Sequence, residues 1–158
     1  MGKIVLIDSQ IFIWGIKGQA SIGQEGNIAH ARTLINWLSD NQYKLLLPVP
    51  QMVELLSYAP PEDQSTICEL FDKRFLIVPF DELAAIKCGE LIYKSLNEEE
   101  LVSYRKEHRV FKNKIKFDCM LVAIAITRGA AKIYSQDPDL VKFANGQIEV
   151  LKMPELIQ

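Results

Sequence analysis

The sequence predicts an α/β fold with three layers, in which helices cover both faces of a central parallel sheet of about four to five strands. Short apolar runs of strand length alternate along the chain with longer segments whose apolar residues recur at helical spacing. The run Ile4–Ile7 is apolar at every position, which is typical of a strand that is buried on both faces. Strands that alternate with helices pair in parallel and carry the helices on the two faces of the sheet.

The N-terminal half contains the first strand, a second strand at 45–47 and several helices. The second strand is stopped by Pro48 and Pro50. The helix at 27–39 carries one apolar stripe. The members of that stripe are Ala31, Leu34, Ile35 and Leu38. The other elements expected here are a short helix at 11–14, a loop at 15–26, and helices at 51–58 and 62–71.

The C-terminal half adds three strands and three helices. Asp81 is expected to cap a helix at 82–96. Asp118 is expected to open a buried helix that is apolar nearly all round and ends at Gly129. The stripe of the helix at 82–96 is Leu83, Ile86, Leu91 and Ile92. The remaining predicted elements are strands at 75–78, 131–134 and 148–151, the buried helix at 118–127, and a short helix at 138–143.

Length and composition predict a single domain spanning residues 1–158. The chain is 49% hydrophobic and 24% charged, which is typical of a globular protein with one core. Its three cysteines are far in sequence from one another and from both histidines, which argues against a zinc site. We expect a cytoplasmic protein without membrane contact, because we find no secretory signal and no apolar segment of about 20 residues.

Four acidic residues stand where an apolar strand or helix meets a turn. Asp8 directly follows the first strand, and Asp137 closely follows the strand at 131–134. Parallel strands end at one edge of the sheet, so both acids should lie near the point where the strand order reverses. Glu54 and Asp118 can reach this edge from neighbouring helices. Carboxylates that are packed together repel unless a cation lies among them, so the set predicts a hard divalent metal and chemistry on phosphate.

Each acid also has a structural explanation. Asp8 and Asp118 are equally well explained as helix N-caps. Asp137 precedes Pro138, and Asp at the N-cap with Pro in the first helical position is a good helix-start signal by itself. Glu54 has apolar neighbours on both sides and needs a partner if it is drawn among them. The prediction of a metal site therefore depends on the set and not on any single acid.

A basic segment precedes the predicted buried helix. Residues 105–116 carry six Lys or Arg side chains against Glu107, although the whole chain has a net charge of −2. Such a segment predicts a local anion-binding face, and a solvated loop explains it equally well. Phe111 within it can stack on a base or pack inward. The basic residues are Arg105, Lys106, Arg109, Lys112, Lys114 and Lys116.

Four motifs in this order resemble the PIN domain family over nearly the whole chain. They are the apolar strand that ends in Asp8-Ser9, then Pro-Gln-Met-Val-Glu54-Leu, then Phe-Asp118-Cys-Met-Leu-Val-Ala-Ile-Ala, then Ile-Tyr-Ser135-Gln-Asp137-Pro-Asp139-Leu. The resemblance implies a metal-dependent nuclease whose commonest substrate is single-stranded RNA. The implied catalytic acids are Asp8, Glu54, Asp118 and Asp137.

The resemblance also implies the cofactor and the supporting groups. The implied cofactor is Mg²⁺ or Mn²⁺, with Asp8, Asp118 and Asp137 as ligands, while Glu54 orients the attacking water or completes the metal shell. Ser9 and Ser135 would support the acids, and Asp139 is either a further supporting group or a solvated charge at a helix start. The basic segment would bind the RNA backbone. Many bacterial members are VapC-like toxins restrained by an antitoxin, so an antitoxin and a second copy of the chain are candidate partners.

Some features depart from the family or suggest alternatives. Gln10 stands where the family commonly has Asn, the loop at 15–26 is longer than in compact toxins, and Lys114 and Lys116 make the segment before Asp118 basic. A haloacid-dehalogenase-like phosphatase needs an acid at the position of Gln10, and a response-regulator receiver needs an acidic pair that this chain lacks. The alternative that remains is a PIN-like module that binds RNA or protein without cleaving, which the presence of all four acids disfavours.

Overall fold

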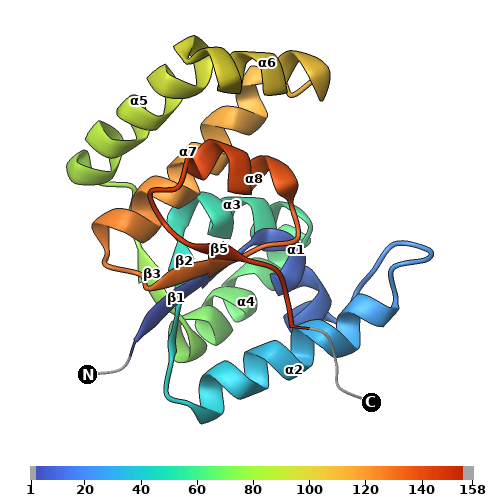
Figure 1. Ribbon diagram of the computed structural model, residues 1–158. Helices are drawn as coiled ribbons and strands as arrows, with labels where there is room; N and C mark the ends of the chain where they lie inside the picture. The colour runs from blue at the N-terminus through green and yellow to red at the C-terminus, as the bar shows by residue number, and fades with distance from the viewer. Residues whose placement is uncertain (1–2, 155–158) are drawn as a thin grey trace.

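A computed structural model describes residues 3–154, and its centre is a sheet of five parallel strands (Figure 1). The strands lie in the order β3-β2-β1-β4-β5, so that β1 is central. The chain moves outward from β1 to β3, then crosses to the other side of β1 to form β4. The strand bounds are β1 Ile4–Ile7, β2 Lys44–Pro48, β3 Leu76–Val78, β4 Lys132–Tyr134 and β5 Val150–Leu151.

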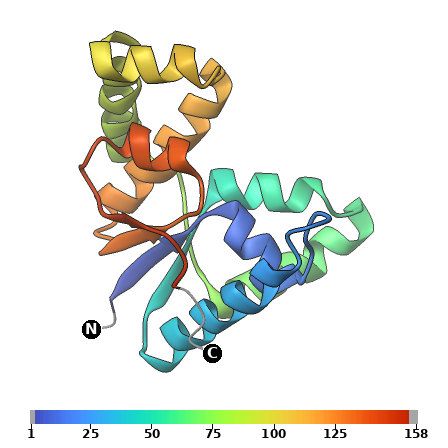
Figure 2. The same ribbon diagram turned by 45° about the vertical axis from the view of Figure 1, so that its right-hand side comes forward.

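Helices cover both faces of this sheet. Four of them, α5 to α8, lie on one side, while α2 and α4 lie on the other (Figures 1 and 2). The predicted three-layer α/β fold with a parallel sheet is therefore confirmed. The helix bounds are α1 Ser9–Phe12, α2 Gly26–Asp40, α3 Val49–Ser57, α4 Pro61–Arg74, α5 Glu82–Asn97, α6 Glu99–Glu107, α7 Lys112–Thr127 and α8 Pro138–Ala144, with one π-helical turn at Ile13–Lys17 after α1.

The central strand divides the apolar core into two parts. Because successive side chains of a strand point to opposite faces, Leu6 packs into one cluster while Val5 and Ile7 pack into the other. The first cluster is formed with residues of α5, α7 and α8, including Leu91, Val122 and Phe143. The second is formed with residues of α1 to α4, including Phe12, Leu34, Leu55 and Phe71. The predicted stripe of α2 is buried in this second cluster.

The register of the sheet brings the ends of β1 and β4 together. Ile7 is paired with Tyr134, and the Asp8 N–H donates to the Tyr134 carbonyl at 3.0 Å. The residues that directly follow these two strands are therefore neighbours at one edge of the sheet. This edge is the point where the strand order reverses, which is where open α/β sheets bind ligands.

The region between α5 and the buried helix differs from the prediction. The segment after α5 forms the helix α6, which we did not predict, and α7 begins at Lys112 instead of Asp118. In α6, acidic side chains in the first turn and basic ones in the last turn suit the helix dipole, and Leu101 anchors the helix in the core. In α7 the added first turns bury Ile115, while Lys112 remains exposed. Propensity and one apolar anchor therefore outweigh the high charge of both segments.

The predicted stripe of α5 is also partly wrong. Leu83 and Ile86 are each 66% exposed, although Leu91 is buried as expected. The face of α5 that is buried instead carries Ala84, Cys88 and Ser95 beside Leu91. These small side chains allow α5 to pack against α7, where the Ser95 hydroxyl lies 4.0 Å from the Cys119 sulfur. The predicted cap is confirmed, because the Asp81 carboxylate accepts the Ala84 N–H at 3.0 Å.

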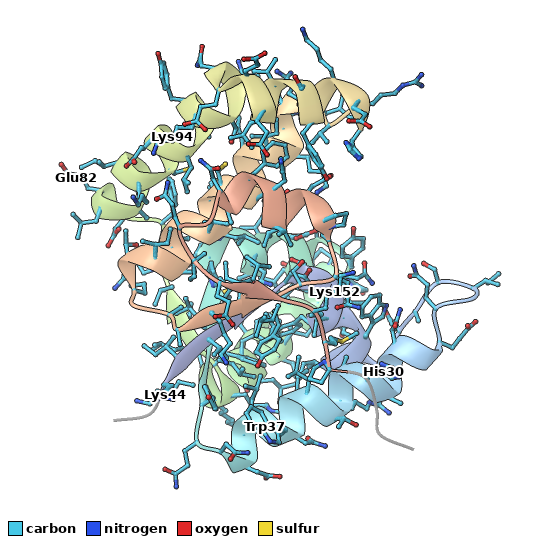
Figure 3. All side chains as sticks on the ribbon, viewed as in Figure 1. His30, Trp37, Lys44, Glu82, Lys94 and Lys152 are labelled. Atoms are coloured by element: carbon cyan, nitrogen blue, oxygen red, sulfur yellow. The ribbon has the colours of Figure 1, made fainter. Side chains whose placement is uncertain are left out.

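The outer surface of α5 lies at the periphery of the molecule, where Figure 3 shows Glu82 and Lys94 away from the sheet. Lys94 and Lys87 both pair with Glu90 along this helix. Such exposed pairs along a helix are screened by solvent and contribute little to stability. Within residues 3–154, none of the helices has the length and apolar character needed to cross a membrane.

Candidate functional site

A pocket of about 680 Å³ opens at the carboxyl ends of β1 and β4. The four acids that the sequence singled out, Asp8, Glu54, Asp118 and Asp137, all line this pocket. They come from the end of β1, from α3, from α7 and from the start of α8. The structure therefore brings together the whole acidic set, although its members are distant in sequence.

Asp8 is 6% exposed, and each of its two carboxylate oxygens accepts a hydrogen bond. One oxygen caps α1 by accepting the Ile11 N–H at 2.9 Å. The other accepts a hydrogen bond from the Ser135 hydroxyl. Burial raises the pKa of Asp8, and the nearby charge of Asp137 adds to this, while the hydrogen bonds from Ile11 and Ser135 oppose it. The capping role and the site role are therefore compatible.

Asp137 uses its carboxylate in the same way. One oxygen caps α8 by accepting the Asp139 N–H at 2.9 Å, and Pro138 takes the first helical position as expected. The other oxygen faces the pocket. The Asp137 N–H donates to the Ser135 hydroxyl at 3.0 Å, and that hydroxyl donates in turn to Asp8. Ser135 thus fixes two of the acids relative to one another.

Asp118 lies in the second turn of α7 and not at its start, so the expectation that it opens the helix or caps it was wrong. The side chain is buried, and Asp118 as a whole is 5% exposed. Burial raises the pKa of Asp118 to about 6, although the neighbouring Lys114 ammonium lowers it. A carboxyl group that is this well buried and lies in a cleft is typical of a functional site.

Glu54 lies on α3 and is held by Ser9, whose hydroxyl donates to a Glu54 oxygen at 2.5 Å. This is the partner that its apolar sequence neighbours required. Another residue of α3, Gln51, is fully buried and donates from its side-chain amide to the Ile7 carbonyl at 2.8 Å. Gln51 therefore joins α3 to the last residue of β1, which directly precedes Asp8. The sequence did not reveal this role.

Lys114 is the residue whose place was not foreseen, because the sequence assigned it to the basic segment. Its ammonium lies 2.5 Å from an Asp137 oxygen, 3.0 Å from Asp118 and 3.2 Å from Asp139. Burial lowers the pKa of Lys114, but the hydrogen bonds and charges of Asp137 and Asp118 outweigh it and hold that pKa above its ordinary value. Lys114 and Asp118 are four residues apart on one helix, a spacing that brings their side chains together.

Asp139 has a second partner on the far side of the cluster. The Tyr104 hydroxyl donates to one of its oxygens at 2.7 Å, while Lys114 approaches the other. Burial and the hydrogen bond to Asp139 raise the pKa of Tyr104 to about 12. Asp139 is therefore partly buried and doubly paired, which is not the solvated helix-start charge that was its alternative explanation.

The other basic residues lie on the last turn of α6, the turn that follows and the start of α7. Arg105 is partly buried and donates to the Val110 carbonyl at 3.2 Å. The exposed members are Lys106, Arg109, Lys112 and Lys116. Phe111 is 80% exposed, so it does not pack inward. Whether these groups contact RNA remains a prediction.

The donor set fits a hard divalent cation by its chemistry. Each of the four acids offers carboxylate oxygens, which are the ligands that Mg²⁺ and Mn²⁺ prefer. No group of three or more His, Cys, Asp or Glu side chains in the described part of the chain is already arranged around a common metal position. The carboxylate oxygens of Asp118, Asp137 and Asp139 surround the Lys114 ammonium instead. Metal binding stays a prediction from donor chemistry.

Comparison with known proteins finds similarity only at the level of structure. No protein-family model matches the chain, and no curated protein matches it in sequence. One similar solved structure is VapBC2 from Rickettsia felis bound to a DNA fragment from its promoter. A chain of that complex has a TM-score of 0.64 and 16% identity, with 94% of this chain and 98% of that chain covered.

Two further complexes agree with this match. A chain of DNA-bound VapBC from Salmonella typhimurium has a TM-score of 0.62 and 20% identity, with 98% of this chain and 100% of that chain covered. A toxin–antitoxin complex from Klebsiella pneumoniae gives a TM-score of 0.57 at 14% identity, with 96% and 99% covered. The likeness spans nearly all of each chain. The protein therefore has the PIN-like fold that its sequence motifs predicted.

Proposed function

We propose that the protein is a divalent-metal-dependent endoribonuclease that hydrolyses phosphodiester bonds in single-stranded RNA. The observation that carries the proposal is the convergence of Asp8, Glu54, Asp118 and Asp137 on one pocket at the switch point of the sheet. Carboxylates at this position are suited to a hard cation and, through it, to a phosphate group. The likeness to toxin–antitoxin structures supports the proposal at the level of the fold.

In this proposal Asp8, Asp118 and Asp137 hold Mg²⁺ or Mn²⁺. The bound ion supplies a Lewis acid that lowers the pKa of a coordinated water and offsets the charge of the phosphate. Ser135 keeps the Asp8 carboxylate in place by donating to it, and it holds the Asp137 backbone beside Asp8 by accepting the Asp137 N–H. Ser9 orients Glu54, which in turn orients the attacking water and accepts its proton.

We also propose that the RNA lies across the pocket and the start of α7. Tyr58 and Phe117 line the pocket and offer aromatic surfaces for bases. Lys106, Arg109, Lys112 and Lys116 are exposed near the same end of the molecule and suit the phosphate backbone. A protein that acts on RNA in this way would work in the cytoplasm.

A protein partner forms part of the proposal. Solved structures with this fold include toxin–antitoxin complexes, so we infer that the chain is a toxin that an antitoxin restrains. Expression of the chain alone should then arrest bacterial growth, and co-expression of a small protein encoded beside it should relieve the arrest. Unimpaired growth on expression of the chain alone would count against the toxin assignment and leave the nuclease assignment to be judged by its own assay.

A non-catalytic binding module is the second candidate, and one contact favours it. Lys114 already neutralises part of the acidic cluster, so the cluster does not require a metal in order to fold. The two candidates differ in a single measurement, which is cleavage of RNA in the presence of the metal.

The Asp8→Asn variant tests the nuclease proposal. Asn is as good an N-cap as Asp, so the cap of α1 is kept while the charge is removed. We expect cleavage of a labelled single-stranded RNA in Mg²⁺ or Mn²⁺ to be lost, with an unchanged circular dichroism spectrum. Asp72→Asn, which changes an exposed acid on α4, is the matched control and should cleave like the unmodified protein. If the unmodified protein cleaves no RNA with either metal, the binding module is the correct assignment.

A further inference from the structure

Lys114 makes the most extensive ion pairing among the described residues. Its ammonium contacts three carboxylates within 3.2 Å, whereas no other Lys or Arg of residues 3–154 pairs with more than one acid. It is also the only basic side chain among the described residues that line the pocket. The site therefore carries one built-in positive charge at its centre.

The Asp118 and Asp137 oxygens that the Lys114 ammonium contacts are also those that a metal bound between these two acids would contact. Asp137 accepts the Asp139 N–H with one oxygen, so the oxygen that faces Lys114 is the one without a structural role in the cap of α8. Asp118 contacts the same ammonium with one oxygen, at 3.0 Å. An ammonium at 2.5–3.0 Å from these oxygens excludes a cation bound to both of them. The ammonium and the metal therefore compete for one place.

The geometry also allows Lys114 to leave. Its side chain is 41% exposed, and its four-carbon stem gives the ammonium several rotamers that reach solvent. Asp139 keeps a partner when Lys114 moves, because the Tyr104 hydroxyl donates to its other oxygen. Asp118 and Asp137 have no such replacement among the contacts of the described residues for the oxygens that face Lys114. Their oxygens are then available to a divalent ion.

We propose that Lys114 is an intramolecular counter-ion whose ammonium holds the Asp118 and Asp137 carboxylates together when no metal is bound. A divalent cation must displace this ammonium in order to bind. This inference depends on the metal site of the proposed function and adds a regulator of its affinity. Lys114 thus lowers the affinity for Mg²⁺ and Mn²⁺ and makes loading depend on the free metal concentration.

The test compares the affinity for Mn²⁺ of the unmodified protein with that of Lys114→Met, measured by titration calorimetry and by electron paramagnetic resonance of free Mn²⁺. Met keeps the length and helix propensity of the side chain and removes its charge. We expect Mn²⁺ to bind at least about tenfold more tightly to this variant, which corresponds to about 1.4 kcal/mol. Lys112→Met is the matched control, because it removes the same charge from an exposed position on the same helix, and its affinity should stay near that of the unmodified protein.

Stability gives a second measurement that is independent of activity. Without metal, Lys114→Met should melt at a lower temperature than the unmodified protein, because its carboxylates repel. Mn²⁺ should raise its melting temperature more, since stabilisation by a ligand grows with affinity. Lys114→Gln, which keeps a hydrogen-bond donor without the charge, serves in place of Met if the Met variant does not fold.

The outcomes separate this inference from the proposed function. Suppose that Mn²⁺ binds to the unmodified protein, does not bind to Asp118→Asn, and binds no more tightly to Lys114→Met than to the unmodified protein. This result overturns the counter-ion role of Lys114 and leaves the metal site intact. Mn²⁺ that binds to none of these proteins overturns both. Tighter binding in Lys112→Met as well as in Lys114→Met would show a general charge effect and would also overturn the specific role of Lys114.

Discussion

Replacement of Asp118 by Asn should make the free energy of unfolding less dependent on pH. Burial raises the pKa of Asp118 in the folded protein from its ordinary value of 3.8 to about 6. The folded state therefore binds more protons than the unfolded state between these two values. Stability falls as the pH rises through this window, because ionisation of Asp118 is easier in the unfolded chain.

The size of the effect follows from the shift. A difference of about two pKa units corresponds to about 3 kcal/mol, since each unit is worth about 1.4 kcal/mol. The opposing charge of Lys114 is already contained in this net shift. The destabilising contribution is absent below about pH 4, where both states are protonated, and complete above about pH 6. Asp118→Asn should thus gain about 3 kcal/mol relative to the unmodified protein on going from pH 4 to pH 7.

Urea unfolding in the presence of a chelator measures this difference, at several pH values between 4 and 7. The chelator is needed because a bound cation would stabilise the ionised carboxylate. Asp72→Asn, which removes a carboxylate from the exposed surface of α4, is the control and is measured over the same pH range. A difference between Asp118→Asn and the unmodified protein that stays constant from pH 4 to pH 7, or that shrinks as the pH rises, would refute the argument from burial.

Three further predictions follow from the contacts around the pocket. Ser135→Ala should lower the free energy of unfolding by about 1–3 kcal/mol, because it leaves a buried Asp8 oxygen and the Asp137 N–H without their partner. Urea denaturation measures this change, and an unchanged midpoint would contradict the prediction. Asp137→Ala should lower the free energy of unfolding by about 0.5–2 kcal/mol because the cap of α8 is lost, whereas Asp137→Asn should lower it much less. Equal losses for the two variants in urea denaturation would argue against the cap. Replacing the four exposed basic residues by Gln should weaken RNA binding and make its affinity less dependent on salt concentration, as measured by fluorescence anisotropy titrations. If the salt dependence is the same before and after the change, the RNA binds elsewhere. Those four residues are Lys106, Arg109, Lys112 and Lys116.

Much of the fold could be predicted because its signals are local. Ile4–Ile7 is a strand with the predicted bounds, and the apolar stripe of α2 is buried as expected. The Asp81 cap and the Asp137-Pro138 helix start are each fixed by a few adjacent residues. In such segments the backbone conformation depends on neighbours in sequence, so a single sequence is sufficient.

The errors occur where tertiary packing decides. The buried face of α5 carries Ala84, Cys88 and Ser95, which permit a close approach to α7 and show no strong hydrophobic signal. The first turns of α7 are rich in lysine, and only the buried Ile115 shows that the helix extends there. The consequence for the site is direct. With α7 begun at residue 118, the spacing that joins Lys114 to Asp118 could not be recognised, and Lys114 was assigned to the basic segment instead.

The pairing of the central strand has a consequence for synthesis of the chain. Ser135 and Asp8 contact one another although 127 positions separate them, and β1 acquires its second neighbour only from β4. Contacts this distant in sequence form late, because the loop between them must be closed first. A nascent chain released from the ribosome before α7 contains Asp8 and Glu54 but lacks Asp118 and Asp137, and one released before β4 still lacks Asp137. Premature termination should therefore yield fragments that lack the complete acidic set, however early their first acids were made.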